Sequence, residues 1–275
     1  MKRILVTGAN SYIGENVRNY LLKEQGDFVV EVKDTFGWEP KPEDFSTYDA
    51  VFNVAGIAHI KETKDNRNLY YDVNRDLVVK IAKAAKKGGV KQFILLSTMS
   101  VYGKTTGYIT KNTAPCPVNA YGKSKLQADI EIEKIASDNF IFTCLRPPMV
   151  YGKDCRGNYQ KLRMVALKSA IFPEYSNKRS MIYIGNLCEF VKKCIEEEKG
   201  GVFFPQNEDY VVTSNMVMHI AKCHNKRIFF TKLFNPAIKL IPADVIKKVF
   251  GDLTYEQVDT VNKYPFKESM IATEA

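Results

Sequence analysis

Apolar and polar positions along the first half of the chain alternate between two periods. Residues 3–7 form a short apolar run, a glycine-bearing stretch follows at 8–14, and 15–26 carries apolar side chains at helical spacing. A second apolar run at 28–34 returns to the pattern of a strand. This order predicts a βαβ unit with parallel strands and a right-handed crossover. The helix is expected to end at Gly26, because glycine often terminates helices.

The same alternation continues to about residue 150. Strands are expected at 49–56, 91–98 and 140–148, and helices at 68–89 and 121–138. Strands that alternate with helices are typical of a doubly wound, Rossmann-like parallel sheet. The predicted fold class is therefore α/β.

The pattern changes after residue 150, where helices predominate. Three short apolar runs predict strands there, at 180–185, 201–205 and 227–230. We expect a dinucleotide-binding domain at 1–150 and a smaller, mostly helical substrate-binding region at 151–275. The segment 180–198 is expected to pack back on the first domain.

Composition and charge restrict the class of protein. The 275 residues are 45% hydrophobic and 26% charged, as in ordinary globular proteins. No apolar run approaches the roughly 20 residues that span a bilayer, and the N-terminus lacks a signal-peptide core, so we expect a cytoplasmic protein without membrane insertion. The net charge is +9, but the basic residues are scattered, and no nucleic-acid partner is expected. The six cysteines have no ligand spacing, which predicts no metal site.

The glycine-bearing stretch "GANSYIG" suits a phosphate. The free N–H groups and partial positive charge of a helix N-terminus attract a pyrophosphate. Gly8 permits the tight turn and Gly14 permits close packing of helix on strand. Ser11 stands where a third glycine is expected, so its side chain would limit how closely the phosphate approaches. In its βαβ context the stretch predicts dinucleotide binding.

The end of the second strand should contact the adenosine ribose of the dinucleotide. A carboxylate there binds the 2′-hydroxyl of NAD, whereas a cation accommodates the 2′-phosphate of NADP. Lys33 occupies this place and Asp34 follows it. At roughly 4 Å and an effective dielectric near 20, the charge–phosphate interaction is about 4 kcal/mol before desolvation. Lys33 favours NADP and Asp34 favours NAD, and the expected cofactor is NAD or NADP with NADP preferred.

The stretch "NAYGKSK" places Tyr121 and Lys125 four residues apart at the start of a predicted helix, and so on one helix face. A nearby ammonium favours the phenolate, so we expect Lys125 to lower the pKa of Tyr121. A tyrosine poised in this way can exchange a proton with a sugar hydroxyl or ketone. The strand before it ends at Ser97 and Thr98, where a hydroxyl can share the charge of the developing oxyanion.

These features occur in a characteristic order. The matching pieces span residues 4–152 and read "VTGANSYIG", "VFNVAG", "LLSTMSVYG", "NAYGKSK" and "LRPPMVYG", with weaker matches at 156–162 and 177–187. In these pieces the sequence resembles the extended short-chain dehydrogenase/reductases, the NAD(P)-dependent epimerases, dehydratases and reductases of nucleotide sugars.

The resemblance implies a role for each matching position. Tyr121 falls at the catalytic acid/base, Lys125 at its partner and Thr98 at the catalytic hydroxyl. Asn158 and Arg179 match positions that hold the diphosphate of the nucleotide-sugar, and Thr98 also contacts this substrate. The expected cofactor contacts are Gly8, Asn10, Ser11, Tyr12, Ile13, Gly14, Lys33, Asp34, Val54, Ala55, Gly56, Asn74, Ser97, Tyr121, Lys125 and Pro148.

The resemblance also implies the activity. We expect redox chemistry at C4 of a UDP-linked sugar, with preference for a 4-keto sugar reductase of cell-surface polysaccharide biosynthesis. A UDP-hexose 4-epimerase with tightly held NAD is the alternative. A dehydratase is disfavoured because Met99 and Ser100, not an acidic pair, follow Thr98. A non-catalytic dinucleotide-binding regulator stays possible as another class. The resemblance further implies a homodimer, through a four-helix interface of 68–87 and 121–137.

Overall fold

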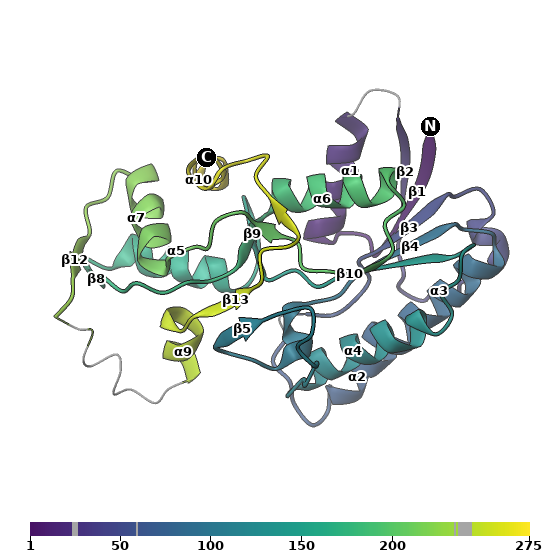
Figure 1. The fold of residues 1–275 in the computed structure, drawn as a ribbon, viewed down its shortest axis with the longest axis horizontal. Coiled ribbons are helices and arrows are strands. Elements are labelled where there is room, and N and C mark those ends of the chain that lie inside the picture. The colour runs from purple at the N-terminus through teal and green to yellow at the C-terminus, as the bar shows by residue number, and fades with distance from the viewer. Residues whose placement is uncertain (24–26, 59, 234, 236–243) are drawn as a thin grey trace. The chain divides into compact units, whose positions relative to one another are not determined.

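The computed structural model describes residues 1–23, 27–58, 60–233, 235 and 244–275 (Figure 1). The chain forms two compact units, each built from separate stretches. The first comprises 1–103, 115–147 and 187–205, and the second comprises 104–114, 148–186 and 206–275.

A six-stranded parallel sheet forms the centre of the first unit, in the order β10-β6-β4-β3-β1-β2. The strands are β1 (Lys2–Thr7), β2 (Phe28–Lys33), β3 (Ala50–Asn53), β4 (Gln92–Leu96), β6 (Ile141–Leu145) and β10 (Gly201–Phe203). The chain continues from β1 to β2 on one side and then to β3 on the other, so the strand order reverses beside β1. Sheets of this kind bind ligands outside the carboxyl ends of the strands at such a reversal. The predicted doubly wound parallel sheet is confirmed.

Helices cover both faces of this sheet. Figure 1 shows α3 (Val78–Lys87) and α4 (Ala120–Glu133) on one side and α1 (Tyr12–Lys23) and α6 (Ile184–Glu196) on the other. The core between the sheet and α3 contains Val78, Ile81 and Ala85 of the helix, which recur at helical spacing, together with strand residues such as Val51 and Phe93. Ala128 and Ile132 of α4 belong to the same core, so both helices pack on this face of the sheet.

Two predicted helices differ from the observed ones. The helix expected at 68–89 consists of α2 (Arg67–Tyr71), a π-helical turn η2 (Asp72–Leu77) and α3. Helix α1 begins at Tyr12, three residues earlier than expected, and its predicted stop at Gly26 lies outside the described residues. Two 3-10 turns, η1 (Pro42–Phe45) and η3 (Met99–Tyr102), had no clear sequence signal.

The second unit contains helices and short parallel strand pairs. The pairs are β5 (Gly107–Ile109) with β13 (Leu253–Tyr255), β7 (Met149–Tyr151) with β9 (Met181–Tyr183), β8 (Ile171–Pro173) with β12 (Phe229–Thr231), and β11 (Gln206–Asn207) with β14 (Thr260–Val261). The helices are α5 (Asn158–Lys168), α7 (Thr213–Cys223), α9 (Asp244–Phe250) and α10 (Phe266–Glu274). Sequence patterns missed six of these strands, because runs of two or three residues carry no detectable period.

A buried carboxylate fastens α10 within this unit. Glu274 accepts hydrogen bonds from Tyr159 (2.5 Å) and from Nε of Arg163 (2.7 Å), both on α5. Its Oε2 also lies 2.6 Å from Nε2 of His224, which follows α7. The side chain of Glu274 is fully buried, so these contacts compensate the loss of its hydration.

The segment 104–114 belongs to the second unit, although the sequence division at residue 150 placed it in the first domain. Its strand β5 pairs with β13, which lies nearly 150 residues later in the chain. Residues 187–205, at the other end, belong to the first unit through the pairing of β10 with β6. The domain boundaries themselves stay a prediction.

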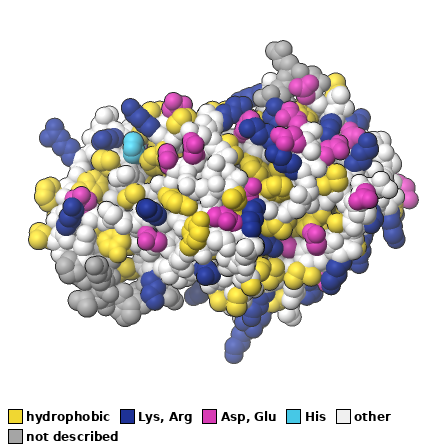
Figure 2. Space-filling model, in the orientation of Figure 1, with side chains coloured by type: hydrophobic (Ala, Val, Ile, Leu, Met, Phe, Trp, Pro, Cys, Tyr) yellow, Lys and Arg dark blue, Asp and Glu magenta, His cyan; other side chains and the backbone are white. Residues whose placement is uncertain are grey.

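The surface carries charges of both signs. On the face shown in Figure 2, Lys and Arg side chains of the described residues are spread among Asp and Glu side chains. Among the described residues, no helix is both long and apolar enough to cross a bilayer.

Candidate functional site

The glycine turn joins the ends of three strands. Gly8 has φ 106°, and a Cβ built on it would lie 2.8 Å from both N and Cα of Ala55, so a larger residue cannot fit there. The N–H of Gly8 donates to the carbonyl of Lys33 at 2.9 Å. A Cβ at Gly14 would lie 2.9 Å from the side chain of Val54, which allows α1 to pack closely beside β3. The turn is thus a backbone cradle that fits a dinucleotide's pyrophosphate.

Ser11 caps the first turn of α1. Its Oγ accepts the N–H of Gly14 at 3.3 Å, which is the contact of an N-cap residue. Asn10 precedes it with φ 61°, a conformation that asparagine tolerates better than most residues. The side chain of Ser11 therefore stabilises the first turn of α1. The sequence had indicated only that this side chain limits the approach of the phosphate.

The end of β2 presents Lys33 and Asp34, and both are exposed. Nζ of Lys33 lies 5.3 Å from the ring centroid of Trp38, within cation–π range. The carboxylate of Asp34 accepts the N–H of Phe36 at 3.0 Å. Each side chain thus has a local partner, and the preference for NADP stays a prediction.

The catalytic helix is positioned by its first turn. Asn119 is the N-cap of α4, which begins at Ala120. Its Oδ1 accepts a hydrogen bond from the N–H of Gly122 at 2.8 Å. A Cβ at Gly122 would lie 2.7 Å from the carbonyl oxygen of Ser100, so the helix packs directly on η3. This contact brings Tyr121 beside Thr98, with which it forms a hydrogen bond.

The protonation state of Tyr121 differs from the sequence expectation. Burial raises the pKa of its phenol above the usual value, although the hydrogen bond with Thr98 acts in the opposite direction. The expectation that Lys125 lowers this pKa is therefore wrong for this structure. Nζ of Lys125 donates instead to the carbonyl of Leu96, at 2.8 Å. Tyr121 is a neutral acid at neutral pH.

Lys125 is itself strongly perturbed. It is only 5% exposed, and burial lowers its pKa to about 8 against the opposing effect of Asp129. A Cβ built on Gly56 would lie 3.3 Å from Nζ of Lys125, so the loop after β3 passes close to the ammonium group. The loop predicted to contact the cofactor and Lys125 therefore lie next to each other.

Asn74 holds this loop in place. It lies in the π-helical turn η2, is fully buried, and its Oδ1 accepts the N–H of Ile57 at 2.7 Å. Its Nδ2 donates to the carbonyl of Ile57 (3.1 Å) and to Oγ of Ser124 (3.3 Å). Asn74 was expected to line the cofactor. In the structure it links the loop after β3 to Ser124 of α4. This loop carries Val54, Ala55 and Gly56, which are also predicted to contact the cofactor.

Three predicted residues lie in the second unit. Pro148 is buried and precedes β7. Asn158 is exposed at the first position of α5. Arg179 donates to the carbonyl of Gly251 at 2.8 Å, and burial lowers the pKa of its guanidinium. The structure thus brings Thr98, Ser97, Tyr121 and Lys125 together in the first unit, and the roles of Asn158 and Arg179 stay predictions.

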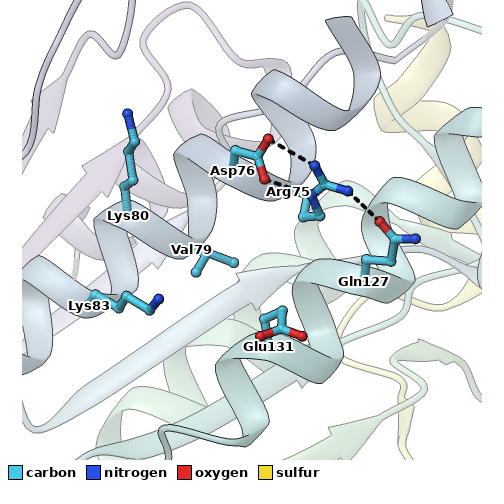
Figure 3. A pocket seen from close by; sticks show the side chains of 7 residues that line it. All are labelled: Arg75, Asp76, Val79, Lys80, Lys83, Gln127 and Glu131. Carbon is cyan, nitrogen blue, oxygen red and sulfur yellow. Dashed lines mark hydrogen bonds and ion pairs between the residues drawn. The ribbon is translucent and has the colours of Figure 1, made fainter. Parts of the chain in front are cut away.

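A hollow of about 700 Å³ opens on the first unit, lined by η2, α3 and α4 (Figure 3). Both atoms of the Asp76 carboxylate bind Arg75, at 2.6 and 2.9 Å, and Arg75 also donates to Gln127 at 2.8 Å. The hollow is lined by Arg75, Asp76, Val79, Lys80, Lys83, Gln127 and Glu131. None of these is a predicted site residue, and the helices are those of the expected dimer interface.

Sequence reasoning missed a charged network on α4, one turn beyond Lys125. Asp129 follows Lys125 by four residues and accepts hydrogen bonds from Ser97 and Arg146. The spacing of four was the signal that could have identified Asp129, but its partners come from two strands far away in the sequence.

Comparison with known proteins identifies the family. The sequence model of the NAD dependent epimerase/dehydratase family matches residues 4–213. The UDP-glucose 4-epimerase of Vibrio cholerae is 28% identical over 94% of this chain and 87% of its own length. The N-acetyl-alpha-D-glucosaminyl-diphospho-ditrans,octacis-undecaprenol 4-epimerase of Escherichia coli O157:H7 is also 28% identical, over 82% of this chain and 73% of its own.

A reductase and a solved structure are also similar. The UDP-2-acetamido-2,6-beta-L-arabino-hexul-4-ose reductase of Pseudomonas aeruginosa is 27% identical over 57% of this chain and 38% of its own length. The crystal structure of UDP-glucuronic acid 4-epimerase from Bacillus cereus in complex with NAD has a TM-score of 0.75 and 20% identity, over 99% of this chain and 97% of its own. At that identity the likeness confirms the fold alone.

Proposed function

The chain belongs to the NAD-dependent epimerase/dehydratase family, and on this premise we propose that it is an NAD(P)-dependent enzyme that transfers hydride at C4 of a nucleotide-linked sugar. The observation that carries the proposal is the cluster of Thr98, Tyr121 and Lys125 within the first unit, beside the glycine cradle of Gly8. The named relatives act at C4 of diphosphate-linked sugars in both branches, as epimerases and as a 4-keto sugar reductase.

Each residue of the cluster has a separate role in the proposed reaction. The bound NAD(P) supplies or accepts the hydride. Tyr121, neutral because burial raises its pKa, donates its phenolic proton to the C4 oxygen when a ketone is reduced. The hydroxyl of Thr98 donates a second hydrogen bond to that oxygen and shares its charge. Lys125, whose Nζ lies close to the loop at Gly56, would hold a ribose hydroxyl of the cofactor.

Two branches of this activity differ in how the cofactor is used. A 4-keto sugar reductase consumes NAD(P)H and releases NAD(P), and exposed Lys33 at the end of β2 supports this branch through NADP. A 4-epimerase keeps one NAD through both half-reactions, and the two relatives that cover most of the chain support this branch. The reductase in cell-surface polysaccharide biosynthesis is the leading proposal, and the epimerase is the second candidate.

Identification of the bound dinucleotide separates the branches. Purified protein is denatured, and any released dinucleotide is identified and quantified by chromatography. Stoichiometric NAD supports the epimerase. Protein free of dinucleotide that binds NADPH more tightly than NADH supports the reductase, and Lys33→Glu should then reverse the preference at least tenfold. Failure to bind any of these dinucleotides would refute both branches and favour a non-catalytic protein.

We also propose that the enzyme is cytoplasmic and forms a homodimer through the helices α2, α3 and α4. Leu69 of α2 and Ile130 of α4 are 45% and 46% exposed, as expected for apolar residues that a second copy covers. Val79 lies in the hollow between these helices, partly exposed. The mass of the protein in solution tests whether it forms a homodimer.

A further inference from the structure

Helix α4 presents three functional side chains in a row. Tyr121, Lys125 and Asp129 follow one another at intervals of four residues and therefore lie on one helix face. Lys125 is 5% exposed and Asp129 is 3% exposed. A carboxylate and an ammonium group so deeply buried need partners, because removal from water strongly disfavours an isolated charge.

The carboxylate of Asp129 is held at one of its two oxygens. Its Oδ2 accepts hydrogen bonds from Oγ of Ser97 at 2.9 Å and from Nε of Arg146 at 3.1 Å. Arg146 in turn donates to the hydroxyl of Tyr102 at 2.8 Å. Oδ1 receives no hydrogen bond from a nitrogen or oxygen donor in the described part of the chain. The thiol of Cys144 also interacts with this carboxylate, and Lys125 lies one turn earlier on the same helix, where the charge of Asp129 acts on it through space.

The other titratable groups around Asp129 support its ionised form. Burial raises the pKa of Asp129, but Arg146 and Ser97 oppose this effect. Burial lowers the pKa of Arg146, but Cys144, Asp129 and Tyr102 together raise it above its usual value. Burial also raises the pKa of Cys144 well above the usual value, so its thiol is neutral. Arg146 is therefore the fixed cation of the cluster.

We propose that Asp129 is a positioning residue for catalysis: its buried carboxylate, one helix turn from Lys125 on the same face of α4, keeps that side chain charged at the place where it donates to Leu96. The inference rests on the proposed function, because it assigns a role in that same site. Asp129 also links α4 to the carboxyl ends of β4 and β6 through Ser97 and Arg146. The cluster therefore ties the helix that carries Lys125 to the sheet.

The consequence for Lys125 follows from two opposing effects. Burial lowers the pKa of its ammonium group to about 8 even though Asp129 acts in the opposite direction. Without the carboxylate the pKa would be lower still, and a large fraction of Lys125 would be neutral at physiological pH. A neutral amine attracts a neighbouring phenolate or ribose oxygen less strongly than an ammonium group does.

The experiment follows Lys125 directly. The protein is labelled with 15N-lysine, and the Nζ chemical shift of Lys125 is titrated by NMR in the wild type, Asp129→Asn and Asp129→Glu, with Lys125→Arg used to assign the signal. The expected midpoint in Asp129→Asn is lower by roughly one pH unit or more, whereas Asp129→Glu keeps the charge and stays close to the wild type. An unchanged midpoint in Asp129→Asn would overturn the proposal.

A second measurement uses the wild type alone, in case Asp129→Asn does not fold. In protein labelled with 13C-aspartate, the carboxyl shift of Asp129 should report an ionised group at pH 7 and should move again as Lys125 titrates. A protonated Asp129 at pH 7 would overturn the proposal.

Neither measurement needs turnover. If C4 chemistry is absent and the titrations behave as expected, only the proposed function fails; if C4 chemistry is present and the Lys125 midpoint is insensitive to Asp129, only this inference fails.

Discussion

Replacement of Lys125, the proposed partner of Tyr121, by methionine should stabilise the protein. Burial lowers the pKa of Lys125 from its usual 10.5 to about 8. Since each pH unit is worth about 1.36 kcal/mol, the charged side chain costs about 3 kcal/mol of stability at pH 7. Methionine has a similar length and no charge. The loss of the hydrogen bond from Lys125 to Leu96 offsets about 1 kcal/mol of this gain, which leaves about 2 kcal/mol.

The pH dependence of the free energy of unfolding shows whether the charge of Lys125 destabilises the folded protein. The unfolded chain binds a proton at Lys125 up to about pH 10.5, whereas the folded chain releases it above about pH 8. Stability therefore rises with pH across this window, because the unfolded state binds more protons there. The advantage of Lys125→Met should be complete below about pH 7 and should disappear as the pH rises from 8 to 10.5.

Urea unfolding of the cofactor-free protein measures this advantage at several pH values. Lys123→Met is the matched control, because Lys123 lies on the same helix but is exposed. It should change stability by only a few tenths of a kcal/mol at every pH. The reasoning would be refuted if Lys125→Met destabilised the protein at pH 7, or if its effect did not change between pH 7 and 10.5.

Three further predictions follow from the geometry. Tyr121→Phe should lower kcat by roughly 10²- to 10⁴-fold without unfolding the protein; turnover at the wild-type rate would contradict the acid/base role. Gly8→Ala should weaken dinucleotide binding at least tenfold in a fluorescence titration, because its Cβ would overlap Ala55. Gly37→Ala, at φ 66° with open space around it, should cost only about 1 kcal/mol and spare binding; equal effects at both glycines would refute the cradle. Ile130→Arg should convert the proposed dimer into a monomer in light scattering, and an unchanged mass would exclude this face.

Sequence patterns predicted the parts of the site that depend on short spacings. Tyr121 and Lys125 share a helix turn, and the glycine turn at Gly8 is local, so their proximity follows from helix and strand geometry alone. The π-helical turn that carries Asn74 was invisible, because its apolar positions also fit a continuous helix. The function of Ser11 as a helix cap depends on α1 starting at Tyr12, three residues earlier than the apolar spacing suggested.

Burial and distant partners account for the rest. The pKa of Tyr121 changes in the direction opposite to the sequence expectation, because desolvation outweighs the nearby hydroxyl and Lys125 binds Leu96 instead. The importance of Asp129 depends on Ser97 and Arg146, which both donate to its Oδ2. Neither partner can be assigned before the strand order of the sheet is known.

The interleaving of the two units has a consequence for how the chain is made. The first unit lacks its edge strand until β10, at Gly201–Phe203, has been synthesised, and the second lacks the partner of β5 until Leu253–Tyr255 has followed. The first unit is complete only after residue 205 has been translated, and the second only after its last stretch, 206–275, has been added. At about 5–20 residues per second, β5 waits roughly 7–30 seconds for its partner, with its edge open to other chains. The first unit of a nascent chain should therefore become resistant to protease only after residue 205 has left the ribosome. Protease resistance of a chain that ends at residue 150 would contradict this order of events.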